Sequence, residues 1–253
     1  MTAVDDLRSQ ALAAFPVYMQ FYDFDDFWTR ANTFTAALQF VTAVRTQWPK
    51  DANVQKTIVQ PFEKVIQTNN QYFQPFLTNH DVWQDDYGWC GIACLAARDY
   101  ILKFKDPSLT PLADPYLKTA ETCWLNMKNN GWDAANTAQP VPHGCANRDW
   151  DRSSVGTKNT VTNACFLMLS LRLYRALRGQ GDAEKYRQMA IESYNWFAQW
   201  FGPQQLYQYL RHPGDAGDLS ARLIHERPWA PPDYLTNHPP KWQEGWVWTA
   251  DQA

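Results

Sequence analysis

Apolar residues recur three and four positions apart along nearly every long segment of the chain, which is the spacing of one face of an α-helix. The segment that begins at Trp28 shows this pattern with Phe34, Leu38, Val41 and Val44. We find no segment with the alternation of apolar and polar residues that is typical of a β-strand. The pattern predicts an all-α protein with helices over residues 3–20, 28–48, 53–73, 87–104, 114–129, 159–179 and 183–201.

The predicted helices alternate in character. Residues 87–102 and 161–177 are apolar on nearly all sides, whereas residues 114–129 and 183–201 keep a charged or amide-rich face. A helix that is apolar all round is typically buried, and an amphipathic helix lies at the surface. This alternation of inner and outer helices is what a double ring of helical hairpins requires.

Two long irregular segments, residues 130–157 and 202–245, interrupt the helices. Loops of this length in a compact domain usually carry function or stay disordered. Both segments contain Trp, His and Asp, which favours a functional role.

Composition excludes several classes of function. The chain is 45% hydrophobic and 19% charged with a formal net charge of -3, so it has no general electrostatic reason to bind nucleic acid or an anionic membrane. No stretch approaches the roughly 20 apolar residues of a membrane span. The first eight residues lack the basic and apolar regions of a signal peptide. As written, the chain is expected to be cytoplasmic, and to be secreted if its N-terminus has been trimmed.

The cysteines predict buried thiols rather than a disulfide framework. Their number is odd and most of them lie inside apolar helical patterns. Cys90 and Cys94 lie one helical turn apart, and together with His143 and Cys145 they could form a zinc site, but their spacing matches no standard zinc pattern. We expect no metal site and no cofactor. The five cysteines are Cys90, Cys94, Cys123, Cys145 and Cys165.

An aspartate pair, Asp85 and Asp86, stands among aromatic residues immediately before the predicted helix at 87–104. Two carboxyl groups can share the cleavage of a glycosidic bond, one as an acid and the other as a nucleophile or base. An aspartate at this place could equally cap the helix. Aromatic residues make up 15% of the chain, which fits a sugar-binding cleft, although large aromatics also fill helical cores.

Several motifs follow one another along the chain: Trp28-Thr29-Arg30-Ala31-Asn32, Asp85-Asp86-Tyr87-Gly88-Trp89-Cys90, Gly131-Trp132-Asp133, Lys158-Asn159-Thr160-Val161-Thr162-Asn163 and Trp246-Val247-Trp248-Thr249-Ala250-Asp251-Gln252. In this order they resemble glycoside hydrolase family 76, the endo-α-1,6-mannanases, over about residues 25–252. The resemblance implies an all-α fold, an (α/α)6 toroid of helical hairpins, as a single domain over residues 1–253. The family domain continues for several helices after the last matching element, so we expect this ring to be C-terminally incomplete.

The resemblance implies a retaining glycoside hydrolase that cleaves α-1,6-mannosidic linkages in mannan-type polysaccharides. Asp85 is then expected to be the nucleophile and Asp86 the general acid/base. Because neighbouring residues of a helix point about 100° apart, we expect at least one of the two to lie in the loop before the helix. The helix N-terminus is expected to lower the pKa of the nucleophile, and repulsion and burial to raise that of the acid.

Substrate binding is assigned by the same resemblance to tryptophans that could stack on sugar rings and to amides that could bind hydroxyl groups. The turn at His143-Gly144-Cys145 stands where the family usually has Gly-Gly, so the sugar-facing surface there is expected to differ. The expected partner is a polysaccharide or oligosaccharide; we expect no nucleic acid, and the oligomeric state stays open. The candidate residues are Trp28, Asn32, Trp89, Trp132, His143, Gly144, Asn159, Asn163, Trp248 and Gln252.

Two alternatives stay open at the level of sequence. One is another enzyme of the α/α-toroid type, an N-acylglucosamine epimerase or an unsaturated uronyl hydrolase, although five scattered histidines argue against the epimerase. The other is a non-catalytic glycan-binding relative. The presence of both Asp85 and Asp86 argues against loss of turnover, and the early end of the ring argues for it.

Overall fold

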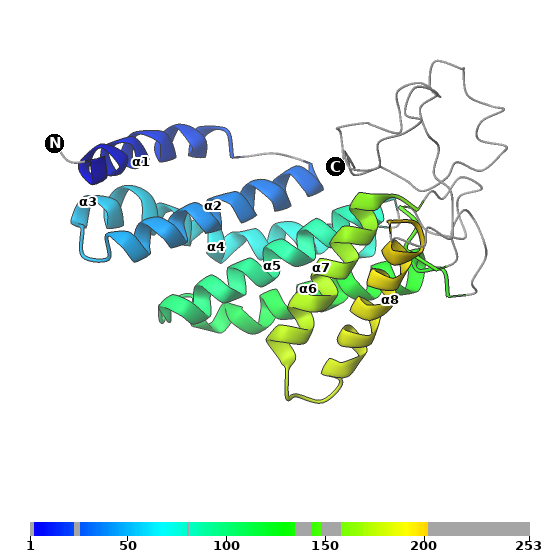
Figure 1. The fold of residues 1–253 in the computed structure, drawn as a ribbon. Coiled ribbons are helices and arrows are strands. Elements are labelled where there is room, and N and C mark those ends of the chain that lie inside the picture. Colours follow the sequence, from blue (N-terminus) through cyan, green and yellow to red (C-terminus); the bar gives the residue numbers. More distant parts are fainter. Residues whose placement is uncertain (1–2, 23–25, 80, 135–142, 148–157, 202–253) are drawn as a thin grey trace, which may run out of the picture. The chain divides into compact units, whose positions relative to one another are not determined.

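The computed structural model describes residues 3–22, 26–79, 81–134, 143–147 and 158–201, and these residues are almost entirely helical (Figure 1). No strand occurs among the described residues, which do contain an isolated antiparallel β-bridge between Trp132 and Cys145. The all-α prediction is therefore confirmed. The α-helices are α1 (Ala3–Gln20), α2 (Phe27–Gln47), α3 (Ala52–Val54), α4 (Gln60–Phe73), α5 (Gln84–Phe104), α6 (Ala113–Asn126), α7 (Thr160–Leu177) and α8 (Ala183–Phe201).

Short π and 3-10 segments extend several of these helices. The predicted helix at 53–73 is split, because a π segment, η1 (Gln55–Val59), separates α3 from α4. Pro61 at the start of α4 has no N–H to donate to the carbonyl of Thr57, which accounts for the wider turn at this point. A second π segment, η4 (Met127–Gly131), continues α6, and the 3-10 segments η2 (Gln74–Thr78) and η3 (Thr110–Leu112) follow α4 and precede α6.

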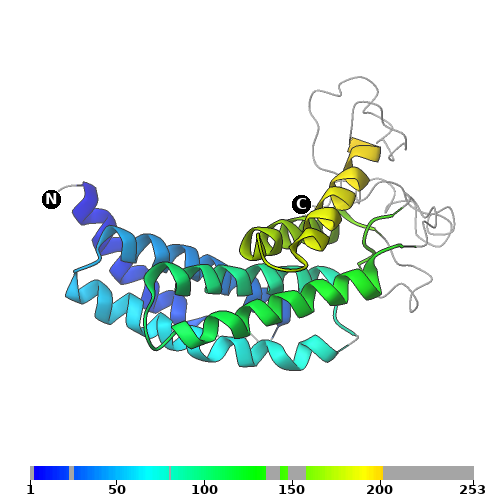
Figure 2. The same ribbon diagram turned by 90° about the horizontal axis from the view of Figure 1, so that it is seen from below.

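The chain groups into two compact units. The first comprises Met1–Asn79 and Trp89–Cys123, and the second His80–Gly88 and Trp124–Ala253. In the first unit α1, α2 and α4 lie lengthwise beside one another (Figure 2). Phe15 of α1 stacks on Phe40 of α2 with 5.7 Å between ring centroids and meets Phe62 of α4 edge-on at 6.1 Å. Aromatic packing therefore forms much of the core of this unit.

The second unit contains the antiparallel hairpin of α7 and α8, which residues 178–182 connect (Figure 1). Trp124 is fully buried there and lies against the ring of Tyr186 at 4.7 Å, and its indole N–H donates to the hydroxyl of Ser170 at 2.8 Å. The N-terminal half of α7 is buried on nearly all sides, as the sequence predicts for an inner helix. Further along the same helix Met168 and Leu171 are exposed, so that prediction is wrong for its C-terminal half.

All five cysteines are buried and free, which confirms the prediction of buried thiols. No helix in the described part of the chain is long and apolar enough to span a bilayer. The expected early end of the ring concerns residues 202–253, which lie outside the described residues.

Candidate active site

The aspartate pair lies in the first turn of α5, which begins at Gln84. The backbone N–H of Gln84 donates to the carbonyl oxygen of Asn147 at 2.9 Å. The first N–H groups of a helix have no acceptor within the helix, and the Asn147 carbonyl supplies one for Gln84. The helix therefore begins three residues earlier than its apolar pattern indicates. The prediction that Asp85 or Asp86 lies in the preceding loop is therefore wrong. As neighbours in one helix, their side chains diverge by about 100°.

Asp85 is the more buried of the two aspartates, with 9% of its surface exposed. Burial raises its pKa to about 6, while hydrogen bonds from its own backbone N–H and from the hydroxyl of Thr162 act in the opposite direction with smaller effect. The expectation that the helix N-terminus lowers the pKa of Asp85 is therefore wrong. Removal of water from the carboxylate outweighs the favourable effect of the helix start.

Helix α7 approaches the start of α5 very closely. A Cβ atom built on Gly88 would lie 2.4 Å from the Cβ of Cys165, which leaves no room for a side chain at position 88. The same approach puts the Thr162 hydroxyl 3.5 Å from Oδ1 of Asp85, as a hydrogen-bond donor. Burial raises the pKa of the Cys165 thiol well above its usual range, and the negative charges of Asp85 and Asp86 raise it further. Cys165 therefore stays protonated beside the aspartate pair.

The isolated bridge holds the Trp132 and Cys145 segments together next to α7. The N–H of Asp133 donates to the carbonyl of Gly144 at 2.9 Å. Oδ1 of Asn163 accepts from the N–H of Cys145 at 2.7 Å, and its amide nitrogen donates back to the carbonyl of the same residue at 2.9 Å. The Asn163 side chain thus fixes the turn from its position in the first part of α7.

Asn159 is the N-cap of α7, because its side-chain oxygen accepts from the N–H of Thr162 at 2.9 Å. The amide of Asn163 also donates to the backbone carbonyl of Asn159, at 2.8 Å. These hydrogen bonds join both side chains to backbone atoms, which positions the start of α7 and with it Thr162. Their predicted contact with sugar hydroxyls stays a prediction.

A buried ion pair joins Lys158, the residue before the N-cap Asn159, to Asp133, the residue after Trp132 of the bridge. Nζ of Lys158 lies 2.7 Å from Oδ2 of Asp133, and the two side chains are 0% and 1% exposed. Burial lowers the pKa of Lys158, and the hydrogen bond to Asp133 and its charge oppose that shift. A buried pair of this kind is weak evidence for stability but strongly constrains geometry, because either charge left alone would be costly.

The structure brings several predicted binding residues together at this bridge. The rings of Trp132 and His143 stack with 6.2 Å between centroids and 11° between planes. Gly144 has a φ of +81°, and a Cβ atom built on it would lie 2.4 Å from Nε1 of Trp196. Trp89, which follows the aspartate pair along α5, is half-buried and belongs to the first unit, so its role stays a prediction.

Four further predicted binding residues belong to the first unit or fall outside the described residues. Trp28 and Asn32 belong to α2 in the first unit, where Trp28 is 48% exposed and accepts a hydrogen bond on its backbone carbonyl from the Asn32 amide at 3.1 Å. Trp248 and Gln252 lie outside the described residues. The roles of all four stay predictions.

The sequence did not indicate three features of this region. Thr162 stands within the motif of residues 158–163, but nothing in the motif marks its hydroxyl as the neighbour of Asp85. The pairing of Lys158 with Asp133 joins residues 25 positions apart, which no local pattern reveals. Trp196 lies in the segment predicted to be an amphipathic helix, and its packing against Gly144 follows from the fold rather than from a local sequence pattern.

Within the described ranges, no group of three or more His, Cys, Asp or Glu side chains is placed to hold a metal ion. The residues available for chemistry at the start of α5 are thus carboxyl groups, hydroxyls and buried thiols.

The described part of the chain is helical and holds a partly buried carboxyl pair at the start of α5, and comparison with known proteins identifies the class. The model of glycosyl hydrolase family 76 matches residues 14–208, which is more than half of the 253 residues. The chain belongs to glycosyl hydrolase family 76. It is therefore a glycoside hydrolase of the α/α-toroid type, acting on mannan-type substrates, as its motifs predict. No curated protein and no solved structure matches the chain.

Proposed function

We propose that the chain is a retaining glycoside hydrolase that cleaves α-1,6-mannosidic linkages, with Asp85 and Asp86 as its catalytic pair. The observation that carries this proposal is the position of the pair in the first turn of α5, inside the matched residues 14–208, with Asp85 nearly buried beside Thr162. Two neighbouring carboxyl groups of unequal burial are what a double-displacement mechanism uses.

In the first step the carboxylate of Asp85 attacks the anomeric carbon while the carboxyl of Asp86 gives its proton to the glycosidic oxygen. The bond between that carbon and oxygen breaks, the first product leaves as an alcohol, and an ester joins the sugar to Asp85. The geometry needed is a separation of about 5–5.5 Å between the two carboxyl groups. Diverging side chains on consecutive helical residues support such a separation.

In the second step the ionised Asp86 takes a proton from water as the water attacks the anomeric carbon. The ester bond breaks, Asp85 regains its carboxylate, and Asp86 is protonated again. Two inversions give net retention of the anomeric configuration.

The role of Asp85 as nucleophile rests on its place in the family motif, because the raised pKa that burial gives it is the property expected of the acid. A pKa of about 6 keeps the carboxylate ionised above that pH, while its burial leaves it poorly hydrated. The hydroxyl of Thr162 supports one oxygen of the carboxylate and leaves the other for attack. Protonation below pH 6 would remove the nucleophile, so kcat/KM is expected to fall on the acid side with an apparent pKa near 6.

Chemical rescue tests the division of roles. With an aryl α-mannoside that has a good leaving group, Asp85→Ala in the presence of azide should give the β-mannosyl azide, because azide replaces the nucleophile directly. Asp86→Ala should give the α-mannosyl azide, because azide then attacks the glycosyl ester. The opposite pair of products would exchange the two roles, and rescue of neither variant would contradict the proposed pair.

A further inference from the structure

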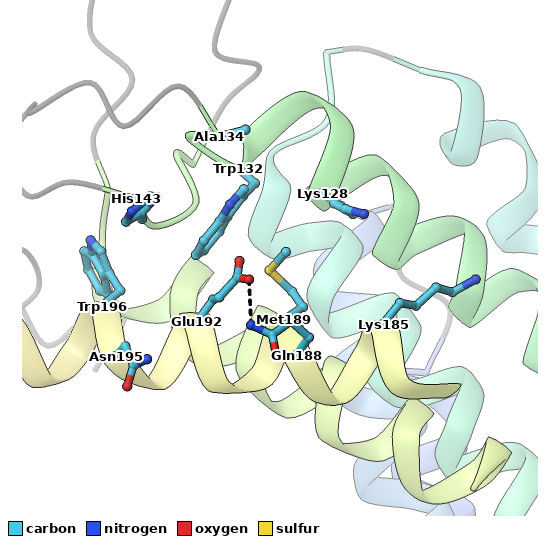
Figure 3. A pocket seen from close by; sticks show the side chains of 10 residues that line it. All are labelled: Lys128, Trp132, Ala134, His143, Lys185, Gln188, Met189, Glu192, Asn195 and Trp196. Carbon is cyan, nitrogen blue, oxygen red and sulfur yellow. Dashed lines mark hydrogen bonds between the residues drawn. The ribbon is translucent and has the colours of Figure 1, made fainter. Parts of the chain in front are cut away.

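A pocket of about 590 Å³ lies beside the bridge, between α8 and the residues around Trp132 and His143 (Figure 3). Its volume falls within the roughly 300–1,000 Å³ of typical small-molecule sites. Asp85 and Asp86 are not among its lining residues, so it is separate from the catalytic side chains. All of its lining belongs to the second unit.

One end of the pocket is aromatic. His143 is exposed and its ring lies nearly parallel to that of Trp132, which is 9% exposed, and the buried Trp196 lies at the same end (Figure 3). Aromatic platforms suit the apolar C–H faces of pyranose rings. At this end the exposed ring of His143, which stacks on Trp132, therefore offers the surface for a sugar ring.

The turn that carries His143 is strained and firmly held. His143 has a φ of +62° and Gly144 a φ of +81°, both in the left-handed region. Such a conformation is unfavourable at a residue other than glycine and persists where the surroundings fix it, often at binding sites. Here Trp196 packs on Gly144, and Asn163 binds the backbone of Cys145.

The polar side of the pocket comes from α8. The half-buried carboxylate of Glu192 projects toward Trp132 (Figure 3), and the amide of Gln188 donates to its Oε1 at 3.1 Å. Asn195, one turn along the same helix, adds an exposed amide to the lining. A carboxylate and an amide can bind the hydroxyl groups of a ligand as acceptor and as donor.

Two lysines line the other end, but their ammonium groups are engaged with other residues. Nζ of Lys128 lies over the ring of Trp124 at 5.3 Å. Nζ of Lys185 lies over the ring of Tyr186 at 5.0 Å and 3.6 Å from Asp182. With its cations engaged in this way and a carboxylate at its centre, the pocket favours a neutral, hydroxyl-rich ligand over an anion.

We propose that this pocket is an accessory saccharide-binding site that holds part of a neutral mannan chain away from the catalytic pair, with Glu192 as its main hydrogen-bonding group. The choice of mannan rests on the proposed function. Binding of the polymer at a second place would raise its residence time on the enzyme without a new catalytic group.

The test uses the full chain made inactive by Asp85→Asn and Asp86→Asn, titrated calorimetrically with linear α-1,6-mannan. Added Glu192→Gln keeps the shape of the side chain and removes its charge, and should weaken binding by roughly 10-fold. Asn195→Ala, at an exposed position, is a second variant for the case that the first does not fold. Glu184→Gln is the matched control, because Glu184 lies on the same helix and pairs with Arg187 at the surface.

Equal affinities of the folded Glu192→Gln, Asn195→Ala and Glu184→Gln chains would overturn the inference, and so would absence of mannan binding by the inactive parent. The two proposals fail separately. If the native chain releases no reducing ends but Glu192→Gln weakens mannan binding, the accessory site stands and the proposed hydrolysis fails. If the native chain cleaves mannan and Glu192→Gln in that active background has the KM of Glu184→Gln, the accessory site fails and the proposed hydrolysis stands.

Discussion

The backbone of Gly88 in α5 lies directly against the side chain of Cys165 in α7: a Cβ atom built on Gly88 would lie 2.4 Å from the Cβ of Cys165. Gly88 follows Asp85 by one helical turn, and Cys165 follows Thr162 by one turn. The same close approach therefore puts the hydroxyl of Thr162 within 3.5 Å of Asp85. A glycine thus determines the environment of the proposed nucleophile.

We expect Gly88→Ala to push α7 away from α5, because the clash is with a Cβ atom that no rotamer change can move. The loss of the Thr162 contact should lower kcat/KM on mannan by at least about 10-fold and lower the melting temperature. Cys165→Ala, which removes only the sulfur at the same contact, is the control and should be much milder. A Gly88→Ala enzyme with native kcat/KM and stability would contradict this account of the contact.

Burial of Asp85 predicts a pH-dependent gain of stability in Asp85→Asn. Its pKa is raised from 3.8 to about 6, so the folded state binds this proton more tightly than the unfolded state does. The group's contribution to stability is complete below pH 3.8 and is lost as the pH rises through 6. Asp85→Asn avoids that loss and should be more stable than the native chain by up to about 3 kcal/mol at pH 8.

The measurement is the free energy of unfolding of both proteins in urea across the pH range. The difference should be largest above pH 7 and should shrink toward pH 4. A difference that is constant with pH, or a variant less stable than the native chain at pH 8, would show that burial does not hold the pKa of Asp85 high.

The helical pattern alone predicted most of the fold. α1, α2 and α8 begin and end within one residue of their predicted bounds, because their apolar stripes and end signals are local. The predicted start of α5 at residue 87 was wrong, because the N–H of Gln84 is bound by the carbonyl of Asn147, which lies far along the chain. The π turn before Pro61 was missed because period counting does not distinguish it from a regular helix.

The site was predictable only as far as its motifs extend. Asp85 and Asp86 stand out as adjacent carboxylates, and the order of the motifs around them indicates the family. The pKa of Asp85 could not be predicted, because it depends on burial by residues distant in sequence. The same holds for Glu192, whose position opposite Trp132 follows from the packing of α8 rather than from a local pattern.

The buried pair of Lys158 and Asp133 predicts strongly non-additive variants. Lys158→Met or Asp133→Asn alone leaves a charge without its partner at a site of at most 1% exposure, and each should cost about 3–5 kcal/mol of stability. The double variant should cost clearly less than the sum, since neither charge then remains. Chemical denaturation of the four proteins measures this, and additive losses would show that the two side chains do not interact.

A side chain at Gly144 should lower the stability of the fold more than the left-handed backbone conformation alone would. Gly144 and Gly179 have φ values of +81° and +84°, but a Cβ atom on Gly144 would lie 2.4 Å from Trp196, whereas one on Gly179 meets no described atom within 4 Å. Gly179→Ala should cost about 1–2 kcal/mol from the backbone conformation. Gly144→Ala should cost more and disturb the stacking of His143.

Thermal denaturation compares the stability of the Gly144→Ala and Gly179→Ala variants directly. The affinity of each variant for mannan shows whether the turn at His143 has been disturbed. Equal losses of stability would mean that Trp196 does not pack against Gly144.

The most direct test of the central claim is release of reducing ends from linear α-1,6-mannan by the native chain, beside the folded Asp85→Asn/Asp86→Asn chain. The account predicts release by the native chain only, with the first product in the α configuration by NMR. No release by a folded native chain, or equal release by the double variant, would contradict the assignment of Asp85 and Asp86 as the catalytic pair of a mannan-cleaving enzyme.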